Sequence, residues 1–211
     1  MIKKNLKIMI ITSVIIVLPI LIGVMLWGDL PAEIPNHWNL NGEIDGWSSK
    51  PFAVIGMPLI MLAIHWITMF IMYSDPKNKD NSNKMMQLAL WIIPVLSIIL
   101  AAVTYFTAMG KNVHVELIVT IFLGVTFIAI GNYMPKCRQS YTVGIKLPWT
   151  LSSEENWNKT HRLGGWVFVG GGILMIIFGM LNIFPAVIIC AGLCAVIPIL
   201  YSGISYYIAQ R

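Results

Sequence analysis

The chain has 211 residues, of which 57% are hydrophobic and only 11% are charged, and its formal net charge is +5. A soluble domain of this size needs more polar surface than this composition supplies, so the chain is predicted to be a membrane protein that crosses the bilayer several times. Its basic balance is attributed to membrane topology, and no direct contact with nucleic acid is expected. The three cysteines supply no disulfide framework.

Six apolar segments are each close to the roughly 20 residues that a helix needs to cross a bilayer. The first is longer than the apolar run of a signal peptide, and no small-residue cleavage site precedes Asp29, so it is retained as a helix. The fold class is therefore predicted to be an all-α polytopic membrane protein with six transmembrane helices and both termini in the cytoplasm. The predicted spans are residues 6–27, 52–73, 85–109, 115–133, 166–183 and 184–208.

The distribution of charge supports this orientation. With both termini inside, twelve of the lysines and arginines lie on inner segments, whereas only Lys50 and Lys111 lie outside. Such an excess of cations on one side is typical of the cytoplasmic face of a membrane protein. The outer side is predicted to be acidic instead, and it carries Asp29, Glu33, Glu43, Asp45 and Glu116.

The organisation is predicted to be a single membrane domain over residues 1–211. Two polar stretches, named here for their predicted sides, interrupt the helices: the outer loop, residues 28–50, and the inner loop, residues 134–165. A third polar stretch, residues 74–84, is interpreted as a flexible, solvated loop with no evident chemistry. The helix pairs are residues 1–73, which include the outer loop, residues 85–133 and residues 166–211.

The outer loop is predicted to form a small hairpin that packs on the membrane surface. Its prolines and glycines exclude a long helix, and Asn41-Gly42 and Asp45-Gly46 are both turn signals. Glu33 and His37 are four residues apart, but Pro35 between them excludes a zinc site carried on a helix. No metal and no cofactor are expected.

The inner loop is predicted to turn and then to enter an amphipathic helix. Gly144 and Pro148 prevent a helix from running through the loop. Ser152 is the expected N-cap of the next helix, with Glu155 completing a capping box. That helix should run into the following apolar segment, and Trp157 and His161, four residues apart on it, should share a face.

One ionisable residue, His65, is predicted to lie within the membrane. Such residues are functional candidates by default. The alternative is a neutral histidine that is hydrogen-bonded to a neighbouring helix, beside an interfacial Trp66, and this alternative is favoured.

Two ordered motifs resemble known families. The outer loop resembles a small domain of unknown function of bacterial membrane proteins, DUF1648, and the inner loop resembles the signature of the SdpI family. Lys146 stands where the SdpI family usually has Arg, and Leu147 where it usually has Thr. The outer matches are Ile34, Pro35, His37, Trp38, Gly42, Asp45, Gly46, Ser49 and Lys50, and the inner ones are Asn132, Pro135, Lys136, Gly144, Ile145, Pro148, Trp149, Thr150, Leu151, Trp157, His161 and Arg162.

The resemblance implies a protein of the bacterial cytoplasmic membrane that protects its cell from a secreted peptide toxin, with a soluble cytoplasmic repressor as a candidate partner. The protein is then in contact with membrane lipids and is not an enzyme. The candidate toxin contacts are His37, Trp38, Asp45, Trp47 and Lys50, and the candidate inner motif, which holds the shape or binds a cytoplasmic partner, is Lys146, Pro148, Trp149, Thr150, Trp157, His161 and Arg162.

Other interpretations remain open. An intramembrane enzyme would use His37 or His161 as an acid or base on a lipid or cell-envelope headgroup. A small transporter is a third class, against which the scarcity of buried charge speaks. For the tryptophans and cations of the inner motif, the alternative role is anchoring at the membrane interface.

Overall fold

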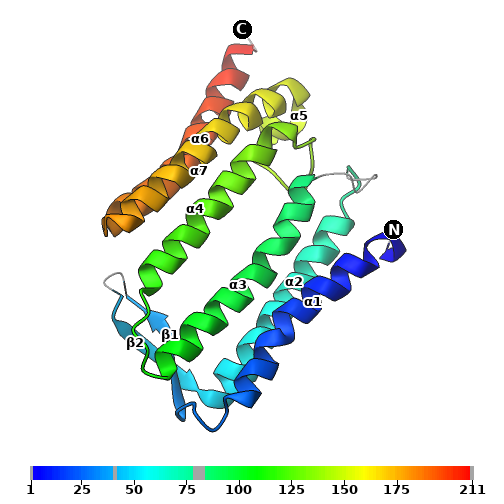
Figure 1. Ribbon diagram of the computed structural model, residues 1–211. Helices are drawn as coiled ribbons and strands as arrows, with labels where there is room; N and C mark the ends of the chain where they lie inside the picture. The colour runs from blue at the N-terminus through cyan, green and yellow to red at the C-terminus, as the bar shows by residue number, and fades with distance from the viewer. Residues whose placement is uncertain (1, 40–41, 78–83, 210–211) are drawn as a thin grey trace. The chain divides into compact units, whose positions relative to one another are not determined.

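The computed structural model describes residues 2–39, 42–77 and 84–209, with side chains from residue 6 onward (Figure 1). The described chain is predominantly helical and carries one two-stranded sheet, which confirms the predicted fold class. The elements are α1 (Ile2–Met25), β1 (Glu33–Trp38), β2 (Ile44–Ser49), the π-helical turn η1 (Phe52–Gly56), α2 (Met57–Tyr73), α3 (Lys84–Ala108), α4 (Val115–Tyr133), the 3₁₀ turn η2 (Met134–Lys136), α5 (Pro148–Ser152), α6 (Glu154–Met180) and α7 (Phe184–Ala209).

Six helices in the described chain are long and apolar enough to cross a membrane, as the sequence predicts. A helix satisfies its own backbone hydrogen bonds, which the hydrocarbon interior requires. The helix that follows the inner loop runs into the fifth apolar segment as predicted, because α6 is continuous from Glu154 to Met180. The sidedness of the termini stays a prediction.

Packing divides the chain into two compact units, and the predicted single domain stays a prediction. The first unit is Met1–Phe70 with Ala89–Glu116, and the second is Ile71–Leu88 with Leu117–Arg211. In the first unit, α1 is hydrogen-bonded to α3 at two levels. The Ser97 hydroxyl donates to the Ile16 carbonyl oxygen at 3.0 Å, and the Tyr105 hydroxyl donates to that of Pro19 at 3.1 Å.

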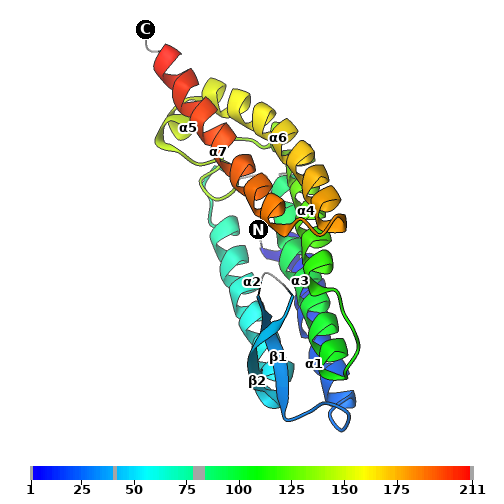
Figure 2. The same ribbon diagram turned by 90° about the vertical axis from the view of Figure 1, so that its left-hand side faces the viewer.

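In the second unit, α6 packs along α7 (Figures 1 and 2) and, through glycines, against α4. A Cβ on Gly124 would lie 2.7 Å from the Gly172 carbonyl oxygen, and one on Gly131 would lie 2.7 Å from that of Gly165. From the first pair to the second, the residue number rises on α4 and falls on α6. The two helices are therefore antiparallel and in close backbone contact. On the other side of α6, the side chain of Cys194 lies against Gly171, so this cysteine is a small packing residue.

The outer loop forms the predicted hairpin, in which β1 pairs with β2 in antiparallel register (Figure 2). The second turn signal is wrong, because Asp45 and Gly46 lie within β2. Gly46 stands opposite His37, where the register is irregular, and a Cβ on Gly46 would lie 2.8 Å from that of His37. Gly42 has a φ of 75°, which a tight turn requires, whereas Asn41 lies outside the described residues.

Candidate functional site

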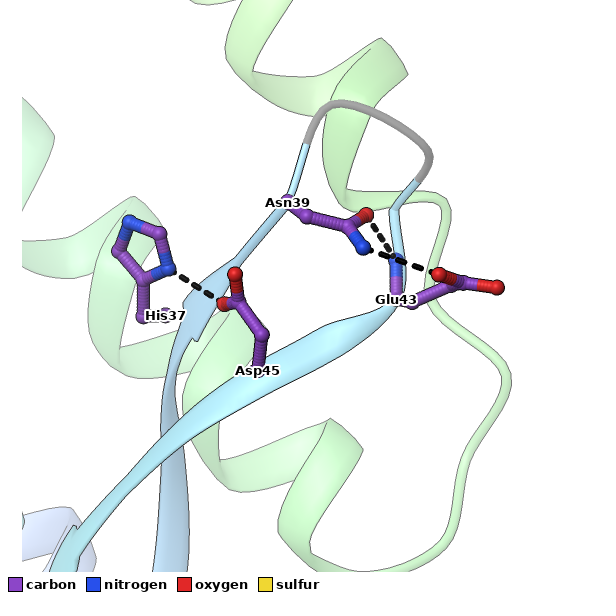
Figure 3. Close-up of polar contacts among 4 residues, drawn as sticks. All are labelled: His37, Asn39, Glu43 and Asp45. Atoms are coloured by element: carbon purple, nitrogen blue, oxygen red, sulfur yellow. Dashed lines mark hydrogen bonds and ion pairs between the residues drawn. The ribbon is translucent and has the colours of Figure 1, made fainter.

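The hairpin exposes polar side chains that pair across its two strands (Figure 3). His37 Nδ1 lies 2.5 Å from a carboxylate oxygen of Asp45. Closer to the turn, the Asn39 side-chain amide donates to the Glu43 carboxylate at 2.9 Å, and the Glu43 backbone N–H donates to the Asn39 side-chain oxygen at 3.0 Å. These pairs hold the two strands together without burying either set of groups.

Exposure separates the two sides of the hairpin. The side chains of His37 and Asp45 are 70% and 44% exposed, and Trp47 is 55% exposed. On the other side, Ile34 is fully buried and packs with Leu30 in a core cluster of the first unit. The hairpin is therefore held by its apolar residues, while His37, Asp45 and Trp47 face outward.

The two remaining outer candidates are less free. Trp38 is half-buried. The Lys50 ammonium donates to the Trp27 carbonyl oxygen at 2.9 Å and lies 5.3 Å from the centre of the Trp27 ring. Lys50 thus ties the end of the loop back to the end of α1, which is a structural task.

His65 lies on α2 and is fully buried against α1. Its Nε2 lies 2.9 Å from the Thr12 hydroxyl oxygen, and that hydroxyl donates to the Ile8 carbonyl oxygen at 2.8 Å. One residue further along both helices, the Trp66 indole N–H donates to the Ser13 hydroxyl at 2.9 Å.

Two side chains of the inner motif form the centre of the inner loop. Trp157 and His161 are fully buried, and their rings stack with centroids 4.0 Å apart, as their spacing of four predicts. The Trp157 indole N–H donates to the Cys137 carbonyl oxygen at 2.8 Å. His161 Nδ1 donates to the Trp157 carbonyl oxygen at 2.8 Å, and Nε2 accepts from the Ile145 N–H at 3.0 Å. Both ring nitrogens of His161 are thus used to hold backbone.

Gly144 lets the loop approach this stacked pair. Its φ is 115°, a conformation that L side chains rarely adopt. A Cβ at this position would lie 2.6 Å from His161 Nε2 and 2.7 Å from the Trp157 ring. The glycine is required both by the turn and by the contact.

Three further motif residues shape the segment, and one of them joins it to α7. Pro148 is the first residue of α5, a position where its missing N–H costs nothing. The buried Thr150 hydroxyl accepts from the Leu147 N–H at 2.9 Å and lies 2.8 Å from the Ile145 carbonyl oxygen. The Trp149 indole donates to the Ser202 hydroxyl at 2.9 Å.

The N-cap prediction is wrong by one residue. Ser152 closes α5, and Ser153 caps α6 by accepting the Asn156 backbone N–H at 3.2 Å. Glu155 takes no part in a capping box and pairs instead with Lys159 at 2.7 Å, one turn further on. Asn156, now in the first turn, donates its side-chain amide to the Ser202 carbonyl oxygen at 2.9 Å.

The inner motif therefore has a buried part and an exposed part. Lys146 and Arg162 are exposed, and the Lys146 ammonium donates to the Thr142 carbonyl oxygen at 3.1 Å. Anchoring at the membrane interface does not account for Trp157, because a fully buried indole ring does not contact lipid.

Sequence reasoning missed Asp75, which lies in the stretch interpreted as a flexible loop. It is 3% exposed and accepts hydrogen bonds from the Ser140 hydroxyl, from the Tyr141 N–H at 2.9 Å and from both the N–H and the hydroxyl of Thr142 at 3.1 and 2.9 Å. Burial raises the pKa of this carboxyl, but the hydrogen bonds outweigh it, so the pKa lies below its ordinary value.

A local signal for Asp75 does exist. Its other carboxylate oxygen accepts the Lys77 N–H at 2.9 Å, two residues on, as in an Asx turn after a helix. Residues 78–83, the remainder of that predicted flexible loop, lie outside the described residues. Among the described residues, no group of three or more His, Cys, Asp or Glu side chains could hold a metal ion.

This arrangement defines a multi-pass membrane protein with a polar hairpin on one connection and a folded, buried motif on another. Residues 136–202 match the SdpI/YfhL protein family, and residues 14–62 match a domain of unknown function, DUF1648. The chain is 30% identical to the immunity protein SdpI of Bacillus subtilis (strain 168) over 173 residues. This aligned region covers 82% of this chain and 80% of that protein. The chain therefore belongs to the SdpI family. No solved structure gives a significant match.

Proposed function

We propose that this protein resides in a bacterial membrane and protects its cell from a secreted peptide toxin. The observation that carries the proposal is the similarity to the immunity protein SdpI, 30% identity over 82% of the chain, together with the two family matches, which cover both polar motifs. The geometry supports different roles for the two loops. We assign toxin contact to the outer loop and maintenance of the fold to the buried part of the inner motif.

The outer assignment rests on which side chains are free to meet a partner. His37, Asp45 and Trp47 are exposed on a hairpin whose opposite side is held in a core cluster. An exposed tryptophan beside polar groups is the kind of side chain that contributes most to binding. Trp38 and Lys50 fit the same proposal as supports of the hairpin.

A cytoplasmic partner, such as a soluble repressor, is assigned to the exposed part of the inner motif. Lys146 and Arg162 are exposed cations on a segment that the buried residues hold in one conformation. Such cations suit an acidic surface on a soluble protein. If Lys146 and Arg162 serve only this contact, replacing both of them would leave protection from the toxin intact.

The enzyme alternative would use His37 or His161, and the second of these gives it no support. His161 is buried, and both of its nitrogens are already hydrogen-bonded to backbone, so neither is free to move a proton to or from a headgroup. Because the similarity is to an immunity protein, we propose a role without catalysis.

The proposal is tested by survival. The gene is expressed in a sensitive bacterium, which is challenged with culture supernatant from the source organism, and the killing dose is compared with that of an empty vector. Wild type should raise the killing dose. His37→Ala and Trp47→Ala, at matched membrane levels, should lower it again, whereas Lys146→Ala with Arg162→Ala should not. Wild type that gives no protection against a supernatant shown to kill the host would refute the immunity role.

A further inference from the structure

A groove lies between α1 and α3 in the first unit, on the halves of the two helices that lead into the hairpin and into α4. Its volume is about 420 Å³. Its lining is apolar, because the one polar side chain in it, Tyr105, gives its hydroxyl hydrogen to the Pro19 carbonyl oxygen. The walls are open, since Ile22, Ile98 and Phe106 are between 42% and 52% exposed.

The groove is continuous with the support of the outer loop. Leu26 and Tyr105 line the groove, and the same two side chains pack with Leu30 and Ile34 beneath the hairpin. Asp29, which is exposed, donates its N–H to the Leu26 carbonyl oxygen at 2.9 Å. A molecule seated in the groove would therefore lie beside the acidic outer loop.

Charge decides which occupant fits. The outer loop and the first turn of α4 carry five carboxylates, against two lysines in the connections of this unit, and the Lys50 ammonium is already bonded to the Trp27 carbonyl oxygen. A phospholipid filling the groove with an acyl chain would bring its phosphate towards this acidic surface. A peptide with lysines or arginines next to an apolar face would bring the opposite charge. The carboxylates are Asp29, Glu33, Glu43, Asp45 and Glu116.

We propose that the groove between α1 and α3 binds an apolar face of a cationic amphipathic segment of the toxin, while the cations of that segment meet the carboxylates of the outer loop. This inference rests on the immunity role proposed above and names the chemistry of its ligand. The binding surface then has two parts: the hairpin supplies the polar part, and the groove supplies the apolar part.

The first test fills the groove. Ala102 lines it and is exposed, and Ala63 is an exposed alanine on α2 outside the lining, so Ala102→Phe and Ala63→Phe are matched variants. In the survival assay at equal membrane levels, Ala102→Phe should lower the killing dose about tenfold from that of wild type, the loss expected when one apolar side chain of the peptide stays unburied. Ala63→Phe should protect like wild type.

Equal protection by Ala102→Phe and wild type overturns the proposal. Native mass spectrometry then identifies the other occupant: a phospholipid that wild type retains and Ala102→Phe loses assigns the groove to an acyl chain. Ala102→Leu is the control for misfolding. Its smaller side chain fills less of the groove, so the killing dose should fall to a value between those of wild type and Ala102→Phe. If wild type itself gives no protection, the immunity role fails first and the groove proposal falls with it.

The second test addresses the charge of the ligand. The supernatant is passed over a cation exchanger and an anion exchanger at neutral pH, and each fraction is assayed on sensitive cells with and without the protein. The killing activity against which the protein protects should be retained by the cation exchanger. Activity that passes through it and binds the anion exchanger contradicts a cationic ligand.

Discussion

The outer and inner loops are both polar connections rich in tryptophan, yet they use these residues in opposite ways. Trp47 on the hairpin is 55% exposed, whereas Trp157 in the inner loop is fully buried. His37 pairs with a carboxylate on the surface, whereas His161 holds backbone on both sides. The difference teaches that a polar motif can be a surface for a partner in one place and a small core in another.

The sharpest test of this contrast compares the two tryptophans. Trp157→Ala removes a buried ring, its stacking on His161 and its hydrogen bond to the Cys137 carbonyl, so the free energy of unfolding should fall by about 3–5 kcal/mol. Trp47→Ala should leave stability nearly unchanged, because the ring is largely exposed. The melting temperatures of the purified variants in detergent measure both. Equal melting temperatures for the two variants would contradict the buried role of Trp157.

A glycine pair tests the backbone of the inner loop. Gly144→Ala should cost about 1–3 kcal/mol of stability, because the residue has a positive φ and the new methyl group would meet His161. Gly170→Ala is the control, since nothing lies within 4 Å of its added Cβ and alanine favours a helix. Thermal unfolding of both variants should show a loss only for Gly144→Ala. A stable Gly144→Ala protein would show that the loop can move away from the stacked pair.

Asp75 gives the inner loop a dependence on pH. Because hydrogen bonds lower its folded pKa below 3.8, the charged carboxylate stabilises the fold above that pH, and the contribution is lost as the pH falls through the lower, folded value. Asp75→Asn should therefore destabilise at pH 7 by about 1–3 kcal/mol, since one buried acceptor is lost, and the gap from wild type should begin to narrow below about pH 4. Melting curves from pH 3 to pH 8 test this, with the exposed Asp29→Asn as control. A gap that stays constant over this range would refute the assignment.

The smallest effect on stability is expected on the hairpin. Asp45→Asn removes one half of an exposed pair with His37, and exposed ion pairs contribute little. The melting temperature should not change measurably, while protection in the survival assay should fall. A large loss of stability would place Asp45 with the inner motif, as a residue of the fold.

The features of the fold that follow from local patterns in the sequence could be predicted. Continuous apolar runs predicted the six spans, and prolines and glycines predicted the hairpin. The spacing of Trp157 and His161 predicted their shared face, which the structure confirms. These features depend on neighbours in the chain, so they can be read locally.

The remainder depends on partners that are distant in sequence. Asp75 meets residues 65 or more positions away, and its local bond to the Lys77 N–H does not identify those partners. The N-cap shifted from Ser152 to Ser153 because a short helix, α5, occupies the preceding turn. The glycine contacts between α4 and α6 require the helix pairing to be known, and the site assignments to the two loops stay proposals.

The measurement that tests the central claim most directly combines protection with stability in one protein. The double variant His37→Ala with Trp47→Ala is expressed in sensitive cells beside wild type, and both the killing dose of the supernatant and the melting temperature of each purified protein are determined. The account predicts that the double variant loses protection while its melting temperature matches that of wild type. Full protection by the double variant, at wild-type membrane levels, would contradict the assignment of toxin contact to the outer loop.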